Sequence, residues 1–380
     1  MDISASEFLG FLNLDWQIVI MLVIGCVLLW LGIAHKVEPV LLVPIGIGCI
    51  LANIPLGGVA EKGGFLAILS DAGIHTEIFP LLIFIGVGAM IDFGPFLSQP
   101  YTILLGAAAQ FGIFGTFFLA YFLGDGWLHV LDFSLKDAAA IGIIGSADGP
   151  TSIFVSTTFQ SKYTAAIVVA AYSYMAMVPI IQPPIIKALT TKKEKIIKMP
   201  YVKGTISQKT KILFPIVTII VVGLLCPKAT PLIGALMFGN LLRECGVVKN
   251  LSETAQNELA NIITILLGIA VGGLMIGSQF LRPETILVFV LGIVAFSLDT
   301  AAGVLLGKLM CVLTKGKVNP MIGACGISAF PMSSRVVQKL GLQFDPHNHL
   351  LMHAAGANTA GQIASVVAGG VMLMLVPIFS

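Results

Sequence analysis

The sequence predicts an all-α polytopic membrane protein, with about ten transmembrane helices and two re-entrant hairpins of broken helix. Three observations predict this fold: the composition, the interruptions within two apolar stretches, and an internal repeat. Apolar residues make up 57% of the 380 positions and charged residues only 11%. Soluble domains carry about 25% charged residues, so the composition excludes a soluble globular protein.

Ten apolar runs are predicted to cross the membrane, because a helical crossing takes roughly 20 mainly apolar residues. In chain order these runs lie at 18–34, 38–54, 80–97, 101–122, 165–189, 212–225, 231–242, 262–280, 285–309 and about 350–378. Two further stretches, 138–159 and 318–334, are apolar but interrupted. We expect each of these two to enter and leave the membrane on the same side.

The first interrupted stretch has an acid at its centre, within Gly145-Ser-Ala-Asp-Gly-Pro-Thr151. Gly149 and Pro150 disfavour a continuous helix, because glycine adds backbone freedom and proline lacks an N–H donor. In hydrocarbon such a break survives only where protein or a wet cavity satisfies the freed backbone groups. A carboxylate at that depth marks an ion path by default, so Asp148 is a candidate ion-binding residue. Alternatively, Asp148 caps the helix that begins at Pro150, and both roles can hold.

The distribution of lysine predicts the orientation of the chain. Residues 187–211 contain eight lysines against the single acid Glu194, and the positive-inside rule places such a loop in the cytoplasm. Alternating the spans from there places both termini outside, and no signal peptide is apparent. Of the remaining basic residues, eight then lie inside and five outside, which favours this topology.

An internal repeat is visible when the chain is compared with itself. Residues 80–97 match residues 264–281 at six of 18 positions, and residues 141–150 match 322–331 at four of ten. An odd number of crossings separates the two copies, so they would have opposite orientations. The sequence therefore predicts an inverted repeat, as in many secondary transporters. Its units would be residues 1–189 and 212–380, joined by the Lys-rich loop 190–211.

Polar residues in and after the second interrupted stretch are candidates for the same site. Asn319 and Ser328 could supply neutral oxygens to a small cation, although capping is the usual role of such residues. Arg335 could hold an anionic substrate by paired hydrogen bonds, or could be an ordinary cytoplasmic arginine. Asn358 lies in the following helix, where it could bind the ion or join neighbouring helices.

Two tyrosines follow the first interrupted stretch. A phenol can donate or accept a hydrogen bond and can relay a proton beside a carboxylate. Tyr174 lies deeper in its predicted span than Tyr172, so Tyr174 is the stronger candidate for this role. The alternative is that both are interfacial aromatics near the outer end of the span.

Other groups have weaker claims to chemistry. Asp299 and Asp92 are acids that lie nearer the cytoplasmic ends of their predicted spans. His347, His349 and His353 could suggest a metal site, but no cysteine accompanies them and an interfacial loop fits better. The six cysteines form no CxxC pair and are interpreted as small buried residues. The chain has no phosphate-binding loop, dinucleotide fingerprint or nucleophile elbow, which argues against ATP-driven transport.

The chain resembles one family over almost its whole length, most specifically at five motifs. They are Ser146-Ala-Asp-Gly-Pro-Thr151, Tyr174-Met-Ala-Met-Val-Pro-Ile-Ile-Gln-Pro-Pro184 before the Lys-rich loop, Gly239-Asn-Leu-Leu-Arg-Glu-Cys-Gly246, the stretch 319–335, and Gly356-Ala-Asn-Thr-Ala-Gly361. At these motifs the chain resembles the β subunits of the sodium-pumping biotin-dependent decarboxylases. That family includes the oxaloacetate, methylmalonyl-CoA and glutaconyl-CoA enzymes. It often has glycine where this chain has Ser146, a change from which we expect little effect.

The resemblance implies a membrane carboxybiotin decarboxylase that couples decarboxylation to Na⁺ export and consumes a proton from outside. The implied catalytic residues are Asp148, Tyr174 and Arg335. The residues implied to meet carboxybiotin, which is carried on a partner subunit, are Arg335, Asn319, Gly323 and Ser328. The implied Na⁺ ligands are Asp148, Asn319, Ser328 and Asn358.

The resemblance also implies the surroundings of the chain. Its expected partners are a carboxyltransferase α subunit, a biotin carrier subunit, a small membrane anchor subunit and membrane lipid, and no nucleic acid. A homotrimer with elevator-like motion in a bacterial-type inner membrane is implied as well. The main alternative is a secondary Na⁺-coupled carboxylate symporter or a Na⁺/H⁺ antiporter on a similar inverted repeat. A third, weaker alternative is a non-catalytic membrane scaffold.

Overall fold

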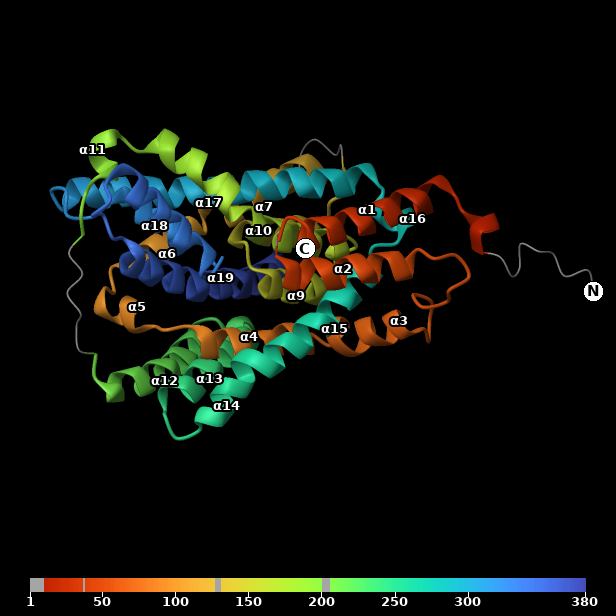
Figure 1. Ribbon diagram of the computed structural model, residues 1–380, viewed down its shortest axis with the longest axis horizontal. Helices are drawn as coiled ribbons and strands as arrows, with labels where there is room; N and C mark the ends of the chain where they lie inside the picture. The colour runs from red at the N-terminus through yellow and green to blue at the C-terminus, as the bar shows by residue number, and fades with distance from the viewer. Residues whose placement is uncertain (1–9, 37, 127–130, 200–205) are drawn as a thin grey trace, which may run out of the picture.

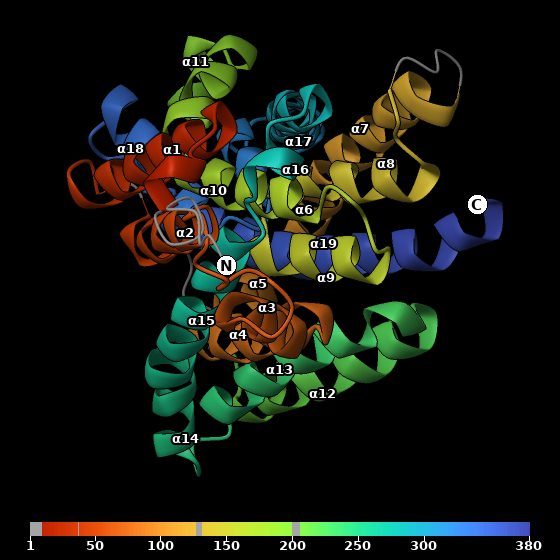
Figure 2. The same cartoon turned by 90° about the vertical axis from the view of Figure 1, so that its right-hand side faces the viewer.

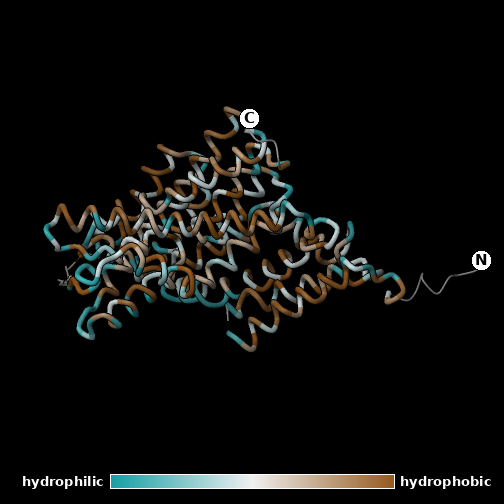
Figure 3. The backbone as a smooth tube through the Cα atoms, turned by 90° about the horizontal axis from the view of Figure 1, so that it is seen from above, coloured by the Kyte–Doolittle hydropathy of each residue, from teal (hydrophilic) through white to brown (hydrophobic). Residues whose placement is uncertain are grey.

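The computed structural model describes residues 10–36, 38–126, 131–199 and 206–380, and these residues form helices and turns without a β-strand. Most helices run along the long axis of the molecule (Figure 1). Hydrophobic residues cover most of the helix bodies, whereas hydrophilic residues gather at helix ends and turns (Figure 3). The predicted all-α class is therefore confirmed for the described residues.

In the first half of the chain the helices are short or broken at many points. They are η2 (Gly10–Asn13), α1 (Trp16–Ile33), α2 (Pro39–Ala52), α3 (Phe65–Ser70), η3 (Asp71–His75), α4 (Ile78–Met90), α5 (Gly94–Ser98), α6 (Thr102–Ala109), α7 (Phe111–Tyr121), η4 (Phe122–Gly126), α8 (Leu135–Gly142), η5 (Ile143–Ser146), α9 (Gly149–Thr158) and α10 (Thr164–Leu189).

The second half contains the two longest helices, α17 and α19. The helices of this half are α11 (Lys192–Lys195), α12 (Gln208–Leu225), η6 (Pro227–Ala229), α13 (Thr230–Glu244), α14 (Lys249–Thr254), η7 (Ala255–Leu259), α15 (Ala260–Gly273), α16 (Gly277–Phe280), α17 (Pro283–Leu313), η8 (Pro320–Gly326), α18 (Met332–Phe344) and α19 (Leu351–Phe379).

Six helices of the described chain are long and apolar enough to cross a membrane, and up to eight if each of two bent pairs counts as one span. Each of these eight overlaps one of the ten predicted runs, although Lys249–Gly273 and the bent pair Phe65–Met90 begin and end earlier than the runs 262–280 and 80–97. The other two runs, 38–54 and 231–242, form α2 and α13, which have only 14 and 15 residues. At about 1.5 Å per residue such helices are about 21–23 Å long, shorter than a hydrocarbon core of about 30 Å.

The first interrupted stretch doubles back on itself, as predicted. The Ser161 hydroxyl donates to Asp137 Oδ1 at 2.6 Å, so the end of α9 returns to the start of α8. The break falls at Ala147, whose φ of 50° is left-handed, and at Asp148. The two arms together form a hairpin, here called the first hairpin (α8, η5 and α9).

The second interrupted stretch forms a second hairpin (η8 and α18), and both of its ends meet the segment 191–199. Asn319 Nδ2 donates to the Ile197 carbonyl at 2.9 Å, and Asn348 Nδ2, after α18, donates to the Lys195 carbonyl at 3.0 Å. The predicted end at 334 is too early, because α18 continues to Phe344. The sequence of α18 is too polar to be recognised as part of an apolar stretch.

The helices form two groups. In the first group α1 packs on α2, α2 on α15, α15 on α4, α4 on α13 and α13 on α12. The second group contains the first hairpin, the second hairpin, α6, α7, α10, α17 and α19. Figure 2 shows the first group running from α1 and α2 around the second group to α13 and α12.

Glycines let the helices of the first group approach closely. A Cβ on Gly88 of α4 would come within 1.9 Å of the Leu236 carbonyl oxygen of α13, and a Cβ on Gly239 of α13 would come within 1.9 Å of the Ile85 carbonyl oxygen. Small residues at such contacts are typical of helix packing in membranes. Asn240 Nδ2 also donates to the Ile91 carbonyl at 2.9 Å, which satisfies a carbonyl just past the end of α4.

The pair α2 and α15 packs in the same manner. A Cβ on Gly48 would come within 2.3 Å of the Ile269 carbonyl oxygen, and one on Gly272 within 2.2 Å of the Ile45 carbonyl oxygen. Asn53 Nδ2 donates to the Met275 carbonyl at 2.7 Å, just past the end of α15. Both helix pairs are therefore held by two glycines and one asparagine.

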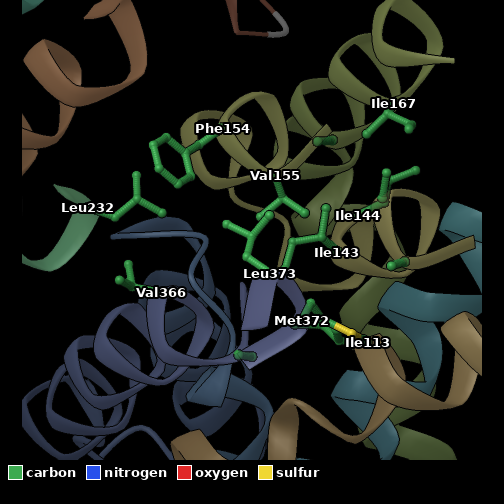
Figure 4. Close-up of a cluster of buried hydrophobic side chains, with 14 of the residues drawn as sticks. Ile113, Ile143, Ile144, Phe154, Val155, Ile167, Leu232, Val366, Met372 and Leu373 are labelled. Carbon is green, nitrogen blue, oxygen red and sulfur yellow. The ribbon is translucent and has the colours of Figure 1, made fainter. Parts of the chain in front are cut away.

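The first hairpin is anchored in the second group by apolar side chains (Figure 4). Ile143 and Ile144 of η5 are fully buried, as is Val155 of α9. They belong to a cluster that includes Val366 and Leu373 of α19. The arms of the hairpin are thus fixed by burial, while the break between them carries the polar groups.

We predict that Gly239→Ala destabilises the protein. The added methyl group would collide with the Ile85 carbonyl, and overpacking of this kind costs about 1–3 kcal/mol. The matched control is Gly234→Ala in the same helix, where an added Cβ meets nothing within 4 Å. That control should be neutral or stabilised by about 0.5–1 kcal/mol. Thermal unfolding of the two purified variants measures the difference, and equal midpoints would contradict the prediction.

Candidate functional site

Asp148 lies at the break of the first hairpin, where its carboxylate caps α9. The Thr151 hydroxyl donates to Asp148 Oδ2 at 2.7 Å, and the Thr151 backbone N–H donates to Oδ1 at 3.3 Å. Pro150 stands in the first turn of α9, where a missing N–H costs nothing. The capping interpretation is therefore confirmed. It leaves the carboxylate at the tip of a half-helix, with only 6% of the residue's surface exposed.

The breaks of the two hairpins touch. The backbone N–H of Ser328, in the non-helical part of the second hairpin, donates to the Ser146 carbonyl of the first at 3.0 Å. Ser146 is the last residue of η5. The two broken segments therefore satisfy each other's free backbone groups, and the tips of the two hairpins meet.

Helix α19 supplies polar groups to this junction. The Ser365 hydroxyl lies 3.5 Å from Asp148 Oδ2 and forms a short hydrogen bond with the Ser328 hydroxyl. Gln362 donates from Nε2 to the Ser328 carbonyl. Asn358 donates from Nδ2 to the Ile327 carbonyl at 2.7 Å, while its Oδ1 is buried and has no partner. Asp148, Ser328 and Asn358 are thus brought together around one backbone junction.

A cavity of about 160 Å³ opens beside Asp148, between the two helix groups. Asp148, Ser328 and Gln362 line it from the second group, and residues of α2, α4 and α15 line it from the first. Tyr172 also lines this cavity. Its hydroxyl is buried and has no hydrogen-bond partner. The cavity therefore offers one acid, one phenol and neutral oxygens at the boundary between the groups.

Tyr174 points elsewhere. Its hydroxyl donates to the Phe289 carbonyl of α17, and its ring lies against Gly292. Arg335 lies on α18 with its side chain exposed and does not line the Asp148 cavity. The predicted catalytic roles of both residues stay predictions, because the structure does not bring either beside Asp148.

Asn319 and Gly323 have structural roles at the far end of the second hairpin. Asn319 Oδ1 accepts from the Met321 N–H at 3.0 Å, so it caps η8, and its amide is bonded to the segment 191–199. A Cβ on Gly323 would come within 2.0 Å of the Gly303 carbonyl oxygen, so Gly323 permits close packing on α17. Their predicted ligand roles stay untested.

Sequence reasoning missed three residues of this site or ranked them low: Ser365, Gln362 and Tyr172. Asn358, Gln362 and Ser365 are spaced by four and three residues, which places them on one face of a helix. That spacing after Asn358 was the available signal. Tyr172 and Tyr174 could not be separated by sequence, because the direction that each faces depends on the packing of α10.

Asp92 and His353 lie away from this junction. Asp92 accepts from the Gly94 N–H at 2.8 Å and lies 3.8 Å from the Lys211 ammonium. The His353 ring contacts the Met199 carbonyl and Gln99. Across the described ranges there is no group of three His, Cys, Asp or Glu side chains that could hold a metal ion. Asp299 lies near the middle of α17 rather than near its end, because that helix has 31 residues.

The fold and this junction define a class: a multi-pass helical membrane protein in which two broken hairpins meet tip to tip beside a carboxylate. Comparison with known proteins specifies the family. Residues 17–376 match the family described as the Na⁺-transporting oxaloacetate decarboxylase beta subunit. The chain belongs to this family of Na⁺-transporting, carboxybiotin-dependent decarboxylase beta subunits.

Curated relatives from three enzymes cover almost the whole chain. The oxaloacetate decarboxylase beta chain of Klebsiella pneumoniae is 47% identical, with 97% of each chain covered. The methylmalonyl-CoA decarboxylase subunit beta of Propionigenium modestum is 50% identical over 96% of each chain. The glutaconyl-CoA decarboxylase subunit beta of Acidaminococcus fermentans is 50% identical, over 98% of this chain and 97% of that one. These relatives favour the decarboxylase interpretation over a secondary transporter.

We predict that cysteines at positions 328 and 365 form a disulfide. The two serine hydroxyls are hydrogen-bonded to each other, so the two side chains point toward each other, as a disulfide requires. The pair is introduced into a variant without the six native cysteines and oxidised mildly, and the linked peptide is detected by mass spectrometry. Each single cysteine variant is the control. Absence of the linked peptide would contradict the contact between the second hairpin and α19.

Proposed function

We propose that this chain decarboxylates carboxybiotin delivered by a partner subunit and uses that reaction to export Na⁺, with one proton consumed from outside. The observation that carries the proposal is the junction of the two hairpins. It places an acid, buried neutral oxygens and a cavity together in a chain of this family. A passive helical bundle would gain nothing from such breaks, because the backbone groups that each break frees need hydrogen-bond partners within the protein.

The proposed Na⁺ site is built from Asp148 and the neutral oxygens around it. Asn358 Oδ1 is buried without a partner, and the hydroxyls of Ser328 and Ser365 lie beside the carboxylate. Broken helices in transporters bind cations through unwound carbonyls and the C-terminal ends of half-helices. The end of η5 at Ser146 meets this description. Asn319 would join the ligands only if its present bonds to the segment 191–199 were released.

The proposed substrate contact is made by Arg335. Its guanidinium is exposed near the start of α18 and can hold the carboxylate of carboxybiotin by two parallel hydrogen bonds. In the reaction the bond between the ureido nitrogen and the carboxyl carbon breaks and CO₂ leaves. The nitrogen keeps the electron pair and takes one proton. We propose that Asp148 supplies this proton, with Tyr174 as the predicted relay and Tyr172 as the phenol lining the cavity.

Competition between Na⁺ and H⁺ at Asp148 would couple the two events. A carboxylate that holds Na⁺ releases it when a proton arrives, so protonation from outside would expel Na⁺ outward. Each net charge moved against 100 mV costs about 2.3 kcal/mol. An obligatory exchange at one acid prevents the proton from passing without the sodium ion.

Repeated contacts support the proposed inverted repeat of residues 1–189 and 212–380. In the two glycine-packed helix pairs, the carbonyls of Ile85 in α4 and of Ile91 just past it correspond to those 184 residues later, Ile269 in α15 and Met275 just past it. The Ile85 carbonyl meets Gly239 and the Ile269 carbonyl meets Gly48, 191 positions earlier than Gly239. The carbonyls that meet the other two glycines, those of Leu236 and Ile45, are also 191 positions apart.

These contacts also favour an elevator-like motion. Each pair joins one helix from each repeat and lies within the first helix group, whereas both hairpins lie in the second. Movement of the second group past the first would carry the Asp148 cavity from one side to the other.

The surroundings of the chain follow from the same proposal. We propose about ten crossings in a bacterial-type inner membrane, with re-entrant hairpins and the Lys-rich loop 190–211 in the cytoplasm, where the carboxybiotin carrier arrives. The expected assembly is a homotrimer with a carboxyltransferase α subunit, a biotin carrier subunit and a small membrane anchor. The beta-subunit names of the relatives support partners of this kind.

We predict that Asp148→Asn folds but loses Na⁺ transport. Asparagine caps a helix as well as aspartate does, so α9 should persist. Loss of the charge should weaken Na⁺ binding about 100-fold, because removing one partner of a buried charged contact costs about 3 kcal/mol or more. Na⁺-dependent decarboxylation by the purified complex measures this. Wild-type coupling in the variant would refute the assignment.

We predict that inverted vesicles take up Na⁺ when a carboxybiotin donor is supplied, and that avidin blocks the uptake. Avidin removes biotin from the reaction, so a decarboxylase pump must stop. The control is an imposed pH gradient without a carboxybiotin donor, which should give no comparable uptake. Uptake that persists in avidin would instead favour a secondary symporter or antiporter.

We predict that Arg335→Glu raises KM for carboxybiotin more than it changes the Na⁺ concentration for half-maximal activity. A hydrogen bond to a charged group contributes about 1.5–3 kcal/mol, so KM should rise about 10- to 100-fold. The matched control is Lys339→Glu, one turn further along α18 and also exposed. Equal losses in both variants would show that only the general positive charge matters.

A further inference from the structure

A second buried acid, Asp299, lies on the other side of the turn that carries Asp148. It is fully buried in the middle of α17, and it takes no part in the site proposed above. Its carboxylate contacts two separate segments, the break between α6 and α7 and the turn η5. Both contacts are distinct from the Asp148 cavity, which Asp299 does not line.

One oxygen of Asp299 is satisfied by the start of α7. Oδ1 accepts from the backbone N–H of Gly112 at 2.5 Å. The first N–H groups of a helix have no partner within the helix and carry a partial positive charge. Asp299 therefore caps α7 from a neighbouring helix, and this explains how the chain tolerates a break between α6 and α7.

The other oxygen is left without a partner. Oδ2 of Asp299 is buried and no donor reaches it, and it faces Gly145 of η5 so closely that a Cβ there would lie 2.6 Å away. A carboxylate at this depth is costly unless it is paired or holds a proton. The side chains of the elements packed against α17 donate no hydrogen bond to Oδ2. Their titratable side chains, none of which bonds Asp299, are Tyr121, Lys136, Asp137, Tyr172, Tyr174, Lys187 and Cys325.

Packing alone does not require an acid at this place. In the second hairpin, Gly326 packs against the Leu105 carbonyl and the Ala109 side chain of α6. In the first hairpin, the corresponding Gly145 packs against Ala295 and Asp299 of α17. Residues 105 and 295, and residues 109 and 299, are each 190 positions apart. An alanine thus fills the corresponding place against the second hairpin. The acid is present only behind the hairpin that carries Asp148.

We propose that Asp299 is a second proton-binding carboxyl of the pump, and that its protonation sets the Na⁺ affinity at Asp148 through the turn η5. This inference rests on the proposed function. A proton needs no oxygen other than Oδ2, whereas a metal ion would need several ligands, so a proton fits the contacts better. Gly145 precedes Asp148 by three residues. Because Gly145 has no side chain, a change of charge at Oδ2 acts directly on the backbone of η5.

The test is the pH dependence of the Na⁺ concentration that gives half-maximal decarboxylation. With two proton sites, a logarithmic plot against pH steepens toward a slope of two on the acid side. Asp299→Asn keeps an oxygen for the Gly112 N–H but cannot titrate, and its slope should fall to one. The control is Thr300→Val, the adjacent buried residue with an unbonded hydroxyl, which should keep the wild-type slope. An unchanged slope in Asp299→Asn overturns the proposal.

A second measurement decides the matter if Asp299→Asn does not fold. Infrared difference spectra of Asp148→Asn between acid and alkaline pH should retain a high-frequency C=O band from a buried carboxylic acid. Absence of that band overturns the proposal. Failure of the proposed function is distinguishable, because wild-type decarboxylation would then show no Na⁺ dependence at all. Failure of the Asp299 proposal alone leaves that dependence intact.

Discussion

The contact between Ser146 and Ser328 is the constraint on which the rest of the structure depends. A helix that breaks inside hydrocarbon exposes backbone groups that water cannot reach, and each must find a protein partner. Here the two breaks are placed so that each supplies a partner for the other. Asp148 also caps the first break locally, and the Gln362 amide of α19 satisfies a carbonyl of the second. The free backbone groups of both breaks are therefore satisfied at one small junction.

The glycine contacts of the first helix group hold that group together beside the junction. Gly48 and Gly272, like Gly88 and Gly239, bring whole helices within backbone contact. Close packing of this kind stabilises helices in membranes without polar groups. Side chains of both groups line the Asp148 cavity, so the cavity lies at the boundary between them.

Features with a local cause could be predicted from the sequence. Gly149 and Pro150 identify the first break, and Asp148 before them identifies both the cap and the buried acid. The spacing of Gln362 and Ser365 after Asn358 places them on one helix face, but no local pattern shows that this face meets the second hairpin. The sequence favours Tyr174 over Tyr172 because Tyr174 lies deeper in its span. Which tyrosine reaches the Asp148 cavity is instead decided by the direction in which each ring points. Direction depends on how α10 packs, which no local pattern encodes.

The segment 191–199 has a consequence for how this protein could be divided or tagged. Its carbonyls accept hydrogen bonds from Asn319 and Asn348, and the Met199 carbonyl contacts the His353 ring. Although it lies in the Lys-rich loop, this stretch is thus bonded to the base of the second hairpin. A cut or an inserted reporter here would act on that base directly. A fragment meant to contain the second hairpin has to include this stretch.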